Sequence, residues 1–201
     1  MSFSDFLINE ISHQANAETT QIKTTTGTYS KAATFLLDKL PENAIVLDYG
    51  AGYGLGTKAM QEVFGDKCTV ESYETSPQGW SPDYTQSESI SKKFDAVVCL
   101  NVLNVLTPDI RDQVTKNILS LVKDGGYVLI GTRGWHGDIA LAKNINKADE
   151  DKAVWVIKSV GEVYQKGFDG NELLDYVSKF NSGFTFKKLN NLTKSSIIGK
   201  K

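Results

Sequence analysis

The sequence has few of the residues that build disulfides and metal sites. Its 201 residues include two cysteines and two histidines. Cys68 and Cys99 lie within apolar runs without CxxC spacing, so we expect buried, reduced thiols. His13 and His136 also lack the neighbours of a metal-ligand motif. The sequence therefore predicts no metal site.

Long apolar runs and a strong excess of one charge are also missing. No stretch reaches the roughly 18–20 apolar residues that span a bilayer. Residues 1–13 carry Asp5 and Glu10 and lack the basic start of a signal peptide. We therefore expect a cytoplasmic protein that does not enter the membrane. The net charge of −2 excludes an overall basic footprint for nucleic acid but allows a local basic patch.

The composition is that of a globular chain, with 40% apolar and 23% charged residues. Residues 1–30 are interpreted as an N-terminal arm or lid, because their second half is polar and rich in Thr. Residues 31–201 have a length that suits a single domain with a sizeable core.

Strand-like and helix-like segments alternate at the start of this domain, which favours an α/β, doubly wound, mostly parallel sheet. The predicted strands are residues 44–50, 68–74, 94–103 and 127–133, and the predicted helices are residues 31–40, 55–65 and 107–126. Residues 133–168 are an insertion on the substrate side that contains a hairpin. A helix with an Asp169–Glu172 capping box and two closing strands complete the chain.

A glycine-rich stretch follows the first predicted strand. Residues 45–57 read IVLDYGAGYGLGT, with Gly50, Gly52, Gly54 and Gly56 at every second position. Glycine lets the backbone turn tightly and approach a ligand that a Cβ atom would block. In a doubly wound sheet, ligands bind beyond the carboxyl ends of the strands, so this loop is the candidate cofactor site.

The loop does not fit a dinucleotide fingerprint, whose last position needs glycine or alanine. Counting from Gly50, this position is Leu55, and counting from Gly52 it is Thr57. Asp48 just before the loop would repel a pyrophosphate, whereas it can pair with an ammonium group. A dinucleotide-dependent oxidoreductase is therefore disfavoured.

The stretch Asp48-Tyr-Gly-Ala-Gly-Tyr-Gly54 resembles the Asp/Glu-x-Gly-x-Gly-x-Gly signature of class I S-adenosylmethionine-dependent methyltransferases. Glu74 stands where this family places an acid that accepts hydrogen bonds from the ribose hydroxyls. The segments FDAVVCLNVLNVL and LVKDGGYVLIGTR are also at family-like positions. The resemblance implies S-adenosyl-L-methionine as cofactor. It implies that the cofactor-binding residues are Asp48, Tyr49, Gly50, Ala51, Gly52, Gly54, Glu74, Thr75 and Asn101.

The resemblance also implies the family's seven-stranded sheet. In this chain, the insertion follows strand five, and the region between strands two and four is shortened. The Thr-rich arm, this short region, LNVLNVL and YQKGF are similar to small methyltransferases of phages and DNA-modification loci.

Asn101 ends the strand that faces the transferable methyl group in this family, so it is a candidate catalytic residue. The residues after it lack the prolines and the aromatic residue of DNA amino-methyltransferases. His136 is a candidate base, because the ordinary pKa of histidine is close to neutrality. Aromatic and basic residues of the insertion are candidate substrate contacts, namely Arg133, Trp135, Tyr164 and Lys166.

These features predict an S-adenosylmethionine-dependent methyltransferase with a slight preference for nucleic acid or a nucleotide as acceptor. A small-molecule methyltransferase is one alternative. A binding module that keeps the cofactor but has lost catalysis is another, because no base or nucleophile is evident in LNVLNVL.

Overall fold

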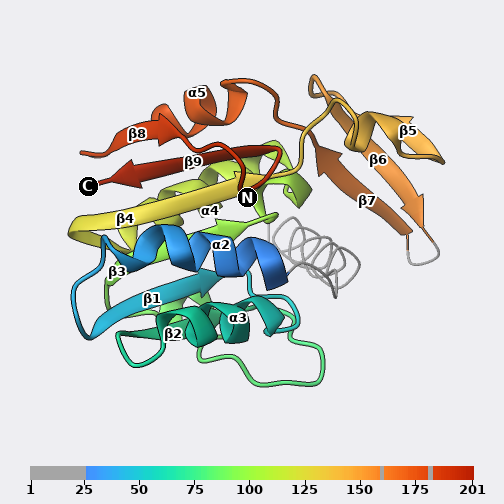
Figure 1. Ribbon diagram of the computed structural model, residues 1–201. Coiled ribbons are helices and arrows are strands. Elements are labelled where there is room, and N and C mark those ends of the chain that lie inside the picture. Colours follow the sequence, from blue (N-terminus) through green and yellow to red (C-terminus); the bar gives the residue numbers. More distant parts are fainter. Residues whose placement is uncertain (1–25, 159–160, 181–182) are drawn as a thin grey trace.

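The computed structural model describes residues 26–158, 161–180 and 183–201 (Figure 1). Most of the predicted arm, residues 1–30, lies outside these ranges. Residues 26–30 do not belong to an irregular arm, because the first helix of the described ranges begins at Thr26. The prediction of a helix over residues 31–40 therefore placed its start too late.

A six-stranded sheet forms the centre of the molecule, in the order β2-β1-β3-β4-β9-β8. β2, β1, β3 and β4 pair in parallel, and β9 runs antiparallel to both β4 and β8. The strands are β1 (Ala44–Tyr49), β2 (Cys68–Tyr73), β3 (Phe94–Leu100), β4 (Val122–Thr132), β8 (Thr185–Lys188) and β9 (Ser195–Lys200). This arrangement confirms the doubly wound, mostly parallel architecture.

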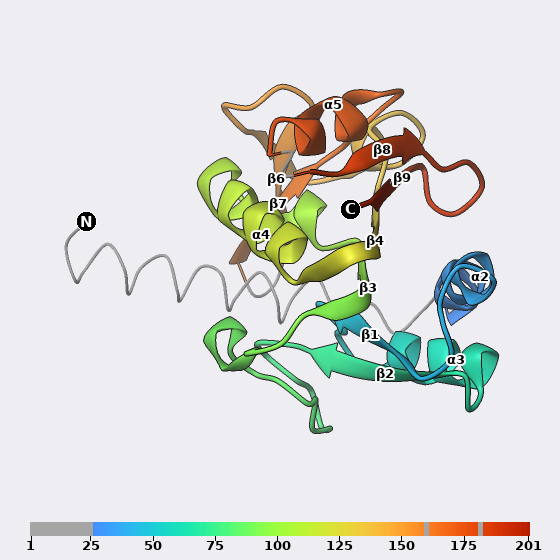
Figure 2. The same cartoon turned by 90° about the vertical axis from the view of Figure 1, so that its left-hand side faces the viewer.

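Two layers of helices cover the sheet, as Figure 2 shows. α2 (Thr26–Leu37) and α3 (Leu55–Phe64) bury Leu36 and Met60 in the apolar cluster on one face. α4 (Pro108–Ser120) and α5 (Glu172–Ser178) bury other apolar side chains in the cluster on the opposite face. Within the described ranges, no helix is long and apolar enough to cross a bilayer.

The predicted seventh strand is missing from the described sheet. The segment between β2 and β3 contributes a single parallel bridge, Tyr73 to Tyr84, and a short turn at Ser87–Ser89. The Tyr84 hydroxyl donates a hydrogen bond to Glu71, which ties this segment to the edge of β2. The shortened region therefore closes the sheet edge with a loop in place of a strand.

The predicted helix over residues 107–126 was too long. Thr107 is its N-cap position and Pro108 its first residue, but the helix ends at Ser120. Val122 is fully buried and pairs with Phe94, so β4 already starts there. Lys123 pairs with Asp95 instead of closing the helix.

A second sheet protrudes beside the central one and confirms the predicted hairpin (Figure 1). β6 (Ala153–Lys158) and β7 (Gly161–Lys166) form this hairpin, and β5 (Ile145–Lys147) adds a third antiparallel strand. β7 contacts the short turn Leu103–Val105, which directly follows β3. The insertion is thus held against the edge where the parallel strands end.

Candidate active site

The glycine loop forms a strand-to-helix turn at the carboxyl end of β1. Gly50, Gly52 and Gly54 have φ angles of 79°, 57° and 72°, a left-handed conformation that side chains disfavour. The N–H groups of Gly50 and Ala51 both donate to the carbonyl of Tyr73, at 2.9 and 3.0 Å. The loop is therefore fastened to the end of β2 before α3 begins.

Two glycines of this loop also permit close packing. A Cβ atom on Gly50 would lie 2.4 Å from Val102, which follows β3. A Cβ atom on Gly56 would lie 2.6 Å from the ring of Tyr29 in α2. These glycines are therefore needed by the fold, independently of any ligand.

Asp48 lies directly below the loop and is fully buried. Its Oδ2 atom accepts a 2.7 Å hydrogen bond from the hydroxyl of Thr57, whereas Oδ1 has no partner among the described residues. Burial raises the pKa of Asp48 to about 7; the charge of Glu74 adds to the increase and the Thr57 hydrogen bond opposes it. An ionised Asp48 thus has one oxygen available for a cationic or N–H donor.

Tyr29 contributes a hydroxyl group to this region that the sequence did not reveal. Burial raises its pKa well above the ordinary value, and the negative charge of Asp48 raises it further. Tyr29 is therefore a protonated phenol close to the Asp48 carboxylate. Its place on α2 comes from tertiary packing against Gly56, and no local motif marks it.

Glu74 is buried and holds the loop from the β2 side. Its carboxylate accepts the N–H of Gly52 at 2.7 Å and the N–H of Ser76 at 3.0 Å. At the same glycine, the indole N–H of Trp80 donates to the carbonyl of Gly52 at 2.8 Å. The Trp80 ring also packs against Gly54. Glu74 and Trp80 therefore fix the conformation of the loop, and the sequence pointed only to Glu74.

The remaining predicted cofactor residues lie around this loop. Asn101 follows β3 with a φ of 60°, exposes its side chain, and donates its backbone N–H to Gly131 at 2.7 Å. Tyr49 is buried with its ring 4.6 Å from that of Tyr73. Ala51 is buried and Thr75 is exposed. The carboxyl ends of the parallel strands thus bring together Asp48, Glu74, the glycines and Asn101.

Comparison with family models identifies a methyltransferase domain over residues 22–158. This match covers more than half of the chain and includes the loop, Asp48 and Glu74. The chain belongs to the class I S-adenosylmethionine-dependent methyltransferases. S-adenosylmethionine is therefore its cofactor, and the unpartnered Oδ1 of Asp48 is compatible with the amino group of such a ligand.

Several solved methyltransferases share the fold of this methyltransferase. An S-adenosylmethionine-dependent methyltransferase from Clostridium acetobutylicum has a TM-score of 0.60 at 13% identity, covering 89% of this chain and 92% of its own. A sugar N-methyltransferase from Streptoalloteichus has a TM-score of 0.62 at 14% identity, with 88% of each chain covered. The 1,6-didemethyltoxoflavin-N1-methyltransferase of Burkholderia thailandensis has a TM-score of 0.57 at 16% identity, covering 98% of this chain and 84% of its own. Comparison with curated protein sequences gives no match. The resemblance to phage methyltransferases stays a prediction.

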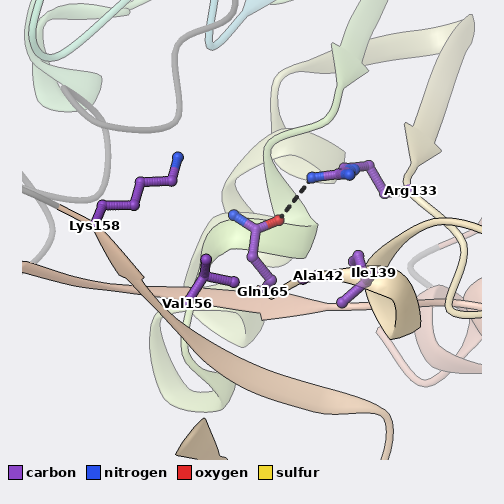
Figure 3. A pocket seen from close by; sticks show the side chains of 6 residues that line it. All are labelled: Arg133, Ile139, Ala142, Val156, Lys158 and Gln165. Atoms are coloured by element: carbon purple, nitrogen blue, oxygen red, sulfur yellow. Dashed lines mark hydrogen bonds between the residues drawn. The ribbon is translucent and has the colours of Figure 1, made fainter. Parts of the chain in front are cut away.

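The insertion of the methyltransferase contains a pocket of about 100 Å³ (Figure 3). Arg133 lines it and is held by Asp138, to which its Nε and Nη2 atoms donate. The Nη1 atom of Arg133 points to the amide oxygen of Gln165 at 3.5 Å. Trp135 is two residues after Arg133, and its backbone N–H donates to Asp169 at 2.9 Å.

Three other predicted residues of the insertion have their polar groups elsewhere. The ammonium of Lys166 is buried and donates to the carbonyls of Asp151 and Gly167 and to Glu172. The hydroxyl of Tyr164 is hydrogen-bonded to Glu150. His136 is 81% exposed and faces Asp169 at 3.5 Å. None of these three lines the described pocket.

A buried arginine joins the insertion to α4, and the sequence did not reveal it. Arg111 is 1% exposed, and its Nη2 atom donates to Glu150 at 2.6 Å. Its guanidinium also lies over the rings of Phe168 and Tyr176. Because Glu150 is shared with Tyr164, Arg111 fixes the position of the small sheet relative to the sheet edge.

Proposed function

We propose that the protein transfers a methyl group from S-adenosylmethionine to a small-molecule acceptor held between the glycine loop and the insertion. The observation that carries this proposal is the unpartnered, buried oxygen of Asp48 at the end of β1. The insertion adds a small pocket of its own. When bound, the cofactor supplies an electrophilic methyl group on a sulfonium. The protein supplies alignment and electrostatics.

In this proposal Asp48 accepts a hydrogen bond from the cofactor's amino group through Oδ1. Glu74 uses its remaining lone pairs for the ribose hydroxyls, while it keeps the N–H of Gly52 in place. The backbone of Tyr49, Ala51 and the glycines lines the cofactor, together with Thr75. Asn101, exposed directly after β3, is proposed to lie closest to the methyl group that is transferred.

Charge pairing in the insertion favours a small acceptor over the nucleic acid that the sequence suggested. Arg133 pairs with Asp138, and Lys166 and Lys152 both pair with Glu172. Phosphate binding needs basic groups that are free to neutralise the backbone. The insertion offers a small pocket instead of a basic strip.

No base is assigned to the reaction. The exposed His136 and the buried Lys166 are left out of the proposed site. Arg133, Lys158 and Gln165, the polar residues that line the described pocket, are all poor proton acceptors at neutral pH. The proposed acceptor therefore attacks through an atom that already carries a free lone pair, as a neutral amine or ring nitrogen does.

Calorimetry with S-adenosylhomocysteine tests the cofactor site. We expect binding by the wild type, loss of most affinity in Asp48→Asn, and wild-type affinity in the matched control Asp66→Asn, which changes an exposed aspartate. Equal binding by all three proteins would contradict the role of Asp48.

Transfer of a labelled methyl group tests the acceptor class. Labelled cofactor is incubated with a metabolite extract and, separately, with DNA and RNA. We expect label in the metabolite fraction only, and none with Asp48→Asn. Label in nucleic acid would refute the small-molecule acceptor, and cofactor binding without any label would indicate a binding module.

A further inference from the structure

The start of α3 is a helix end that no side chain caps. This helix has 10 residues, and its N-cap position is Gly54, which makes no side-chain capping hydrogen bond. Its first turn contains no acidic residue. The N-terminus of a helix carries a partial positive charge and backbone N–H groups that point outward, so it favours an anionic group. By itself this helix end does not define a ligand.

A buried oxygen atom shows that a ligand comes close to this helix end. Thr57, in the first turn of α3, donates its hydroxyl to Oδ2 of Asp48 at 2.7 Å. Oδ1 of the same carboxylate is buried and has no partner among the described residues. Under the proposed function, Oδ1 accepts the amino group of the cofactor. The cofactor's amino group is thereby placed next to the first turn of α3.

Tyr29 of α2 packs against the same turn. A Cβ atom on Gly56 would lie 2.6 Å from the Tyr29 ring, so the ring reaches the helix backbone only because Gly56 has no side chain. The groups that act electrostatically on the phenol are Asp48, Cys99 and Glu74. They lie at or directly after the carboxyl ends of β1, β3 and β2, and hence the hydroxyl lies at this edge of the sheet. Burial raises the pKa of Tyr29 and the charge of Asp48 raises it further, so the phenol keeps its proton and can donate a hydrogen bond.

The amino-acid end of the cofactor carries a carboxylate as well as an ammonium group. A single carbon joins the two groups, so the carboxyl carbon lies roughly 2.5 Å from the nitrogen. A cofactor whose ammonium contacts Asp48 must therefore place its carboxylate close by. The charges of Asp48 and Glu74 repel this group, and the indole N–H of Trp80 is already bonded to Gly52. Of the groups described around Asp48, the start of α3 and the phenol of Tyr29 are suited to receive the carboxylate.

We infer that Tyr29 binds the carboxylate of the cofactor, with its phenol as the donor and the first turn of α3 as the electrostatic support. Asp48 and Tyr29 then bind the two opposite charges of one amino-acid group. The contact of Asp48 rests on the proposed function, whereas the anion-binding position beside Tyr29 and α3 does not. This pair of residues makes the site selective for a ligand that carries both charges on one carbon.

Calorimetry with three ligands tests this assignment. S-adenosylhomocysteine carries both charges, its decarboxylated analogue carries only the ammonium, and its deaminated analogue carries only the carboxylate. Tyr29→Phe removes the hydroxyl and keeps the ring over Gly56. We expect this variant to bind S-adenosylhomocysteine and the deaminated analogue at least tenfold more weakly, because a hydrogen bond to a charged group is lost. Its affinity for the decarboxylated analogue should change less than twofold.

Tyr127→Phe is the matched control, because it removes a phenol hydroxyl from a half-buried residue that pairs with Ala96 in the first half of β3. All its affinities should stay within twofold of the wild type. Unchanged binding in Tyr29→Phe would overturn the inference, and so would equal weakening of all three ligands, since a packing defect does not distinguish the charge of the ligand. Wild-type binding of S-adenosylhomocysteine by Asp48→Asn would refute the proposed Asp48 contact alone. Methyl transfer to nucleic acid would refute the proposed acceptor and leave the role of Tyr29 standing.

Discussion

Asp48→Asn is expected to stabilise the free protein while it weakens the cofactor site. The pKa of Asp48 is raised from 3.8 to about 7, chiefly by burial. Between these two values the folded protein keeps a proton that the unfolded chain has released. The free energy of unfolding therefore falls as the pH rises through this window, and it is lowest above pH 7. The full shift corresponds to roughly 4 kcal/mol.

The Asn variant has no titrating group at this position, so a comparison of the two proteins isolates this effect. From pH 5 to pH 8, the linkage relation gives a loss of roughly 2–3 kcal/mol in the wild type relative to Asp48→Asn. Urea unfolding at both pH values, followed by circular dichroism, measures this difference. Asp66→Asn should follow the wild type. Parallel pH profiles for wild type and Asp48→Asn would refute a buried, raised-pKa carboxyl group.

The same group sets the pH dependence of cofactor binding if only its ionised form accepts the amino group. With a pKa of about 7, the ionised fraction rises about tenfold between pH 6 and pH 8. Calorimetry should therefore give a Kd for S-adenosylhomocysteine that is about tenfold weaker at pH 6. A Kd that is independent of pH in the wild type would contradict the direct contact.

Three further substitutions test the packing around the site. Gly56→Ala should lower the free energy of unfolding by about 1–3 kcal/mol, because its Cβ atom would overlap the Tyr29 ring; an unchanged urea midpoint would contradict this packing. S-adenosylhomocysteine should change the tryptophan emission of the wild type and not that of Trp80→Phe, because this indole contacts the glycine loop; an equal change in both proteins would place the signal elsewhere. Arg111→Met should lower the free energy of unfolding by about 2–3 kcal/mol, somewhat below the range for a fully buried ion pair because Glu150 is 29% exposed. Limited proteolysis should then cut the insertion faster than in the wild type. Wild-type resistance to the protease would refute the anchoring role of Arg111.

Local patterns were sufficient to predict the alternating elements and the loop. The apolar runs around Val46 and Val97 predicted buried parallel strands, and the structure confirms them. The hairpin around Trp155 and Tyr164 is confirmed as well, with these two residues paired across the strands. These features depend on neighbours in the sequence, and hence a single sequence contains the information.

Features that depend on distant partners were missed or misplaced. Val122 continued the helical repeat of α4, but pairing with Phe94 draws it into β4. Tyr29 precedes the glycine loop in the sequence and Trp80 follows it, but both contact the loop in the fold. No spacing rule connects either residue to the loop. Lys166 was predicted to bind substrate because it is basic and lies near aromatic residues. In the structure its ammonium group donates to the carbonyl of Asp151 and to Glu172, and the sequence does not show that these acceptors lie close to it.

The two acids of the loop region differ in how far the free protein satisfies their carboxylate oxygens. Glu74 satisfies both of its oxygens with backbone N–H groups, so its charge already stabilises the loop without a cofactor. Asp48 has one satisfied and one unsatisfied oxygen in a fully buried position. A buried acceptor without a partner costs about 1–3 kcal/mol. A ligand that donates to Asp48 removes this cost, and therefore the proposed cofactor contact would use the same oxygen atom that destabilises the free fold.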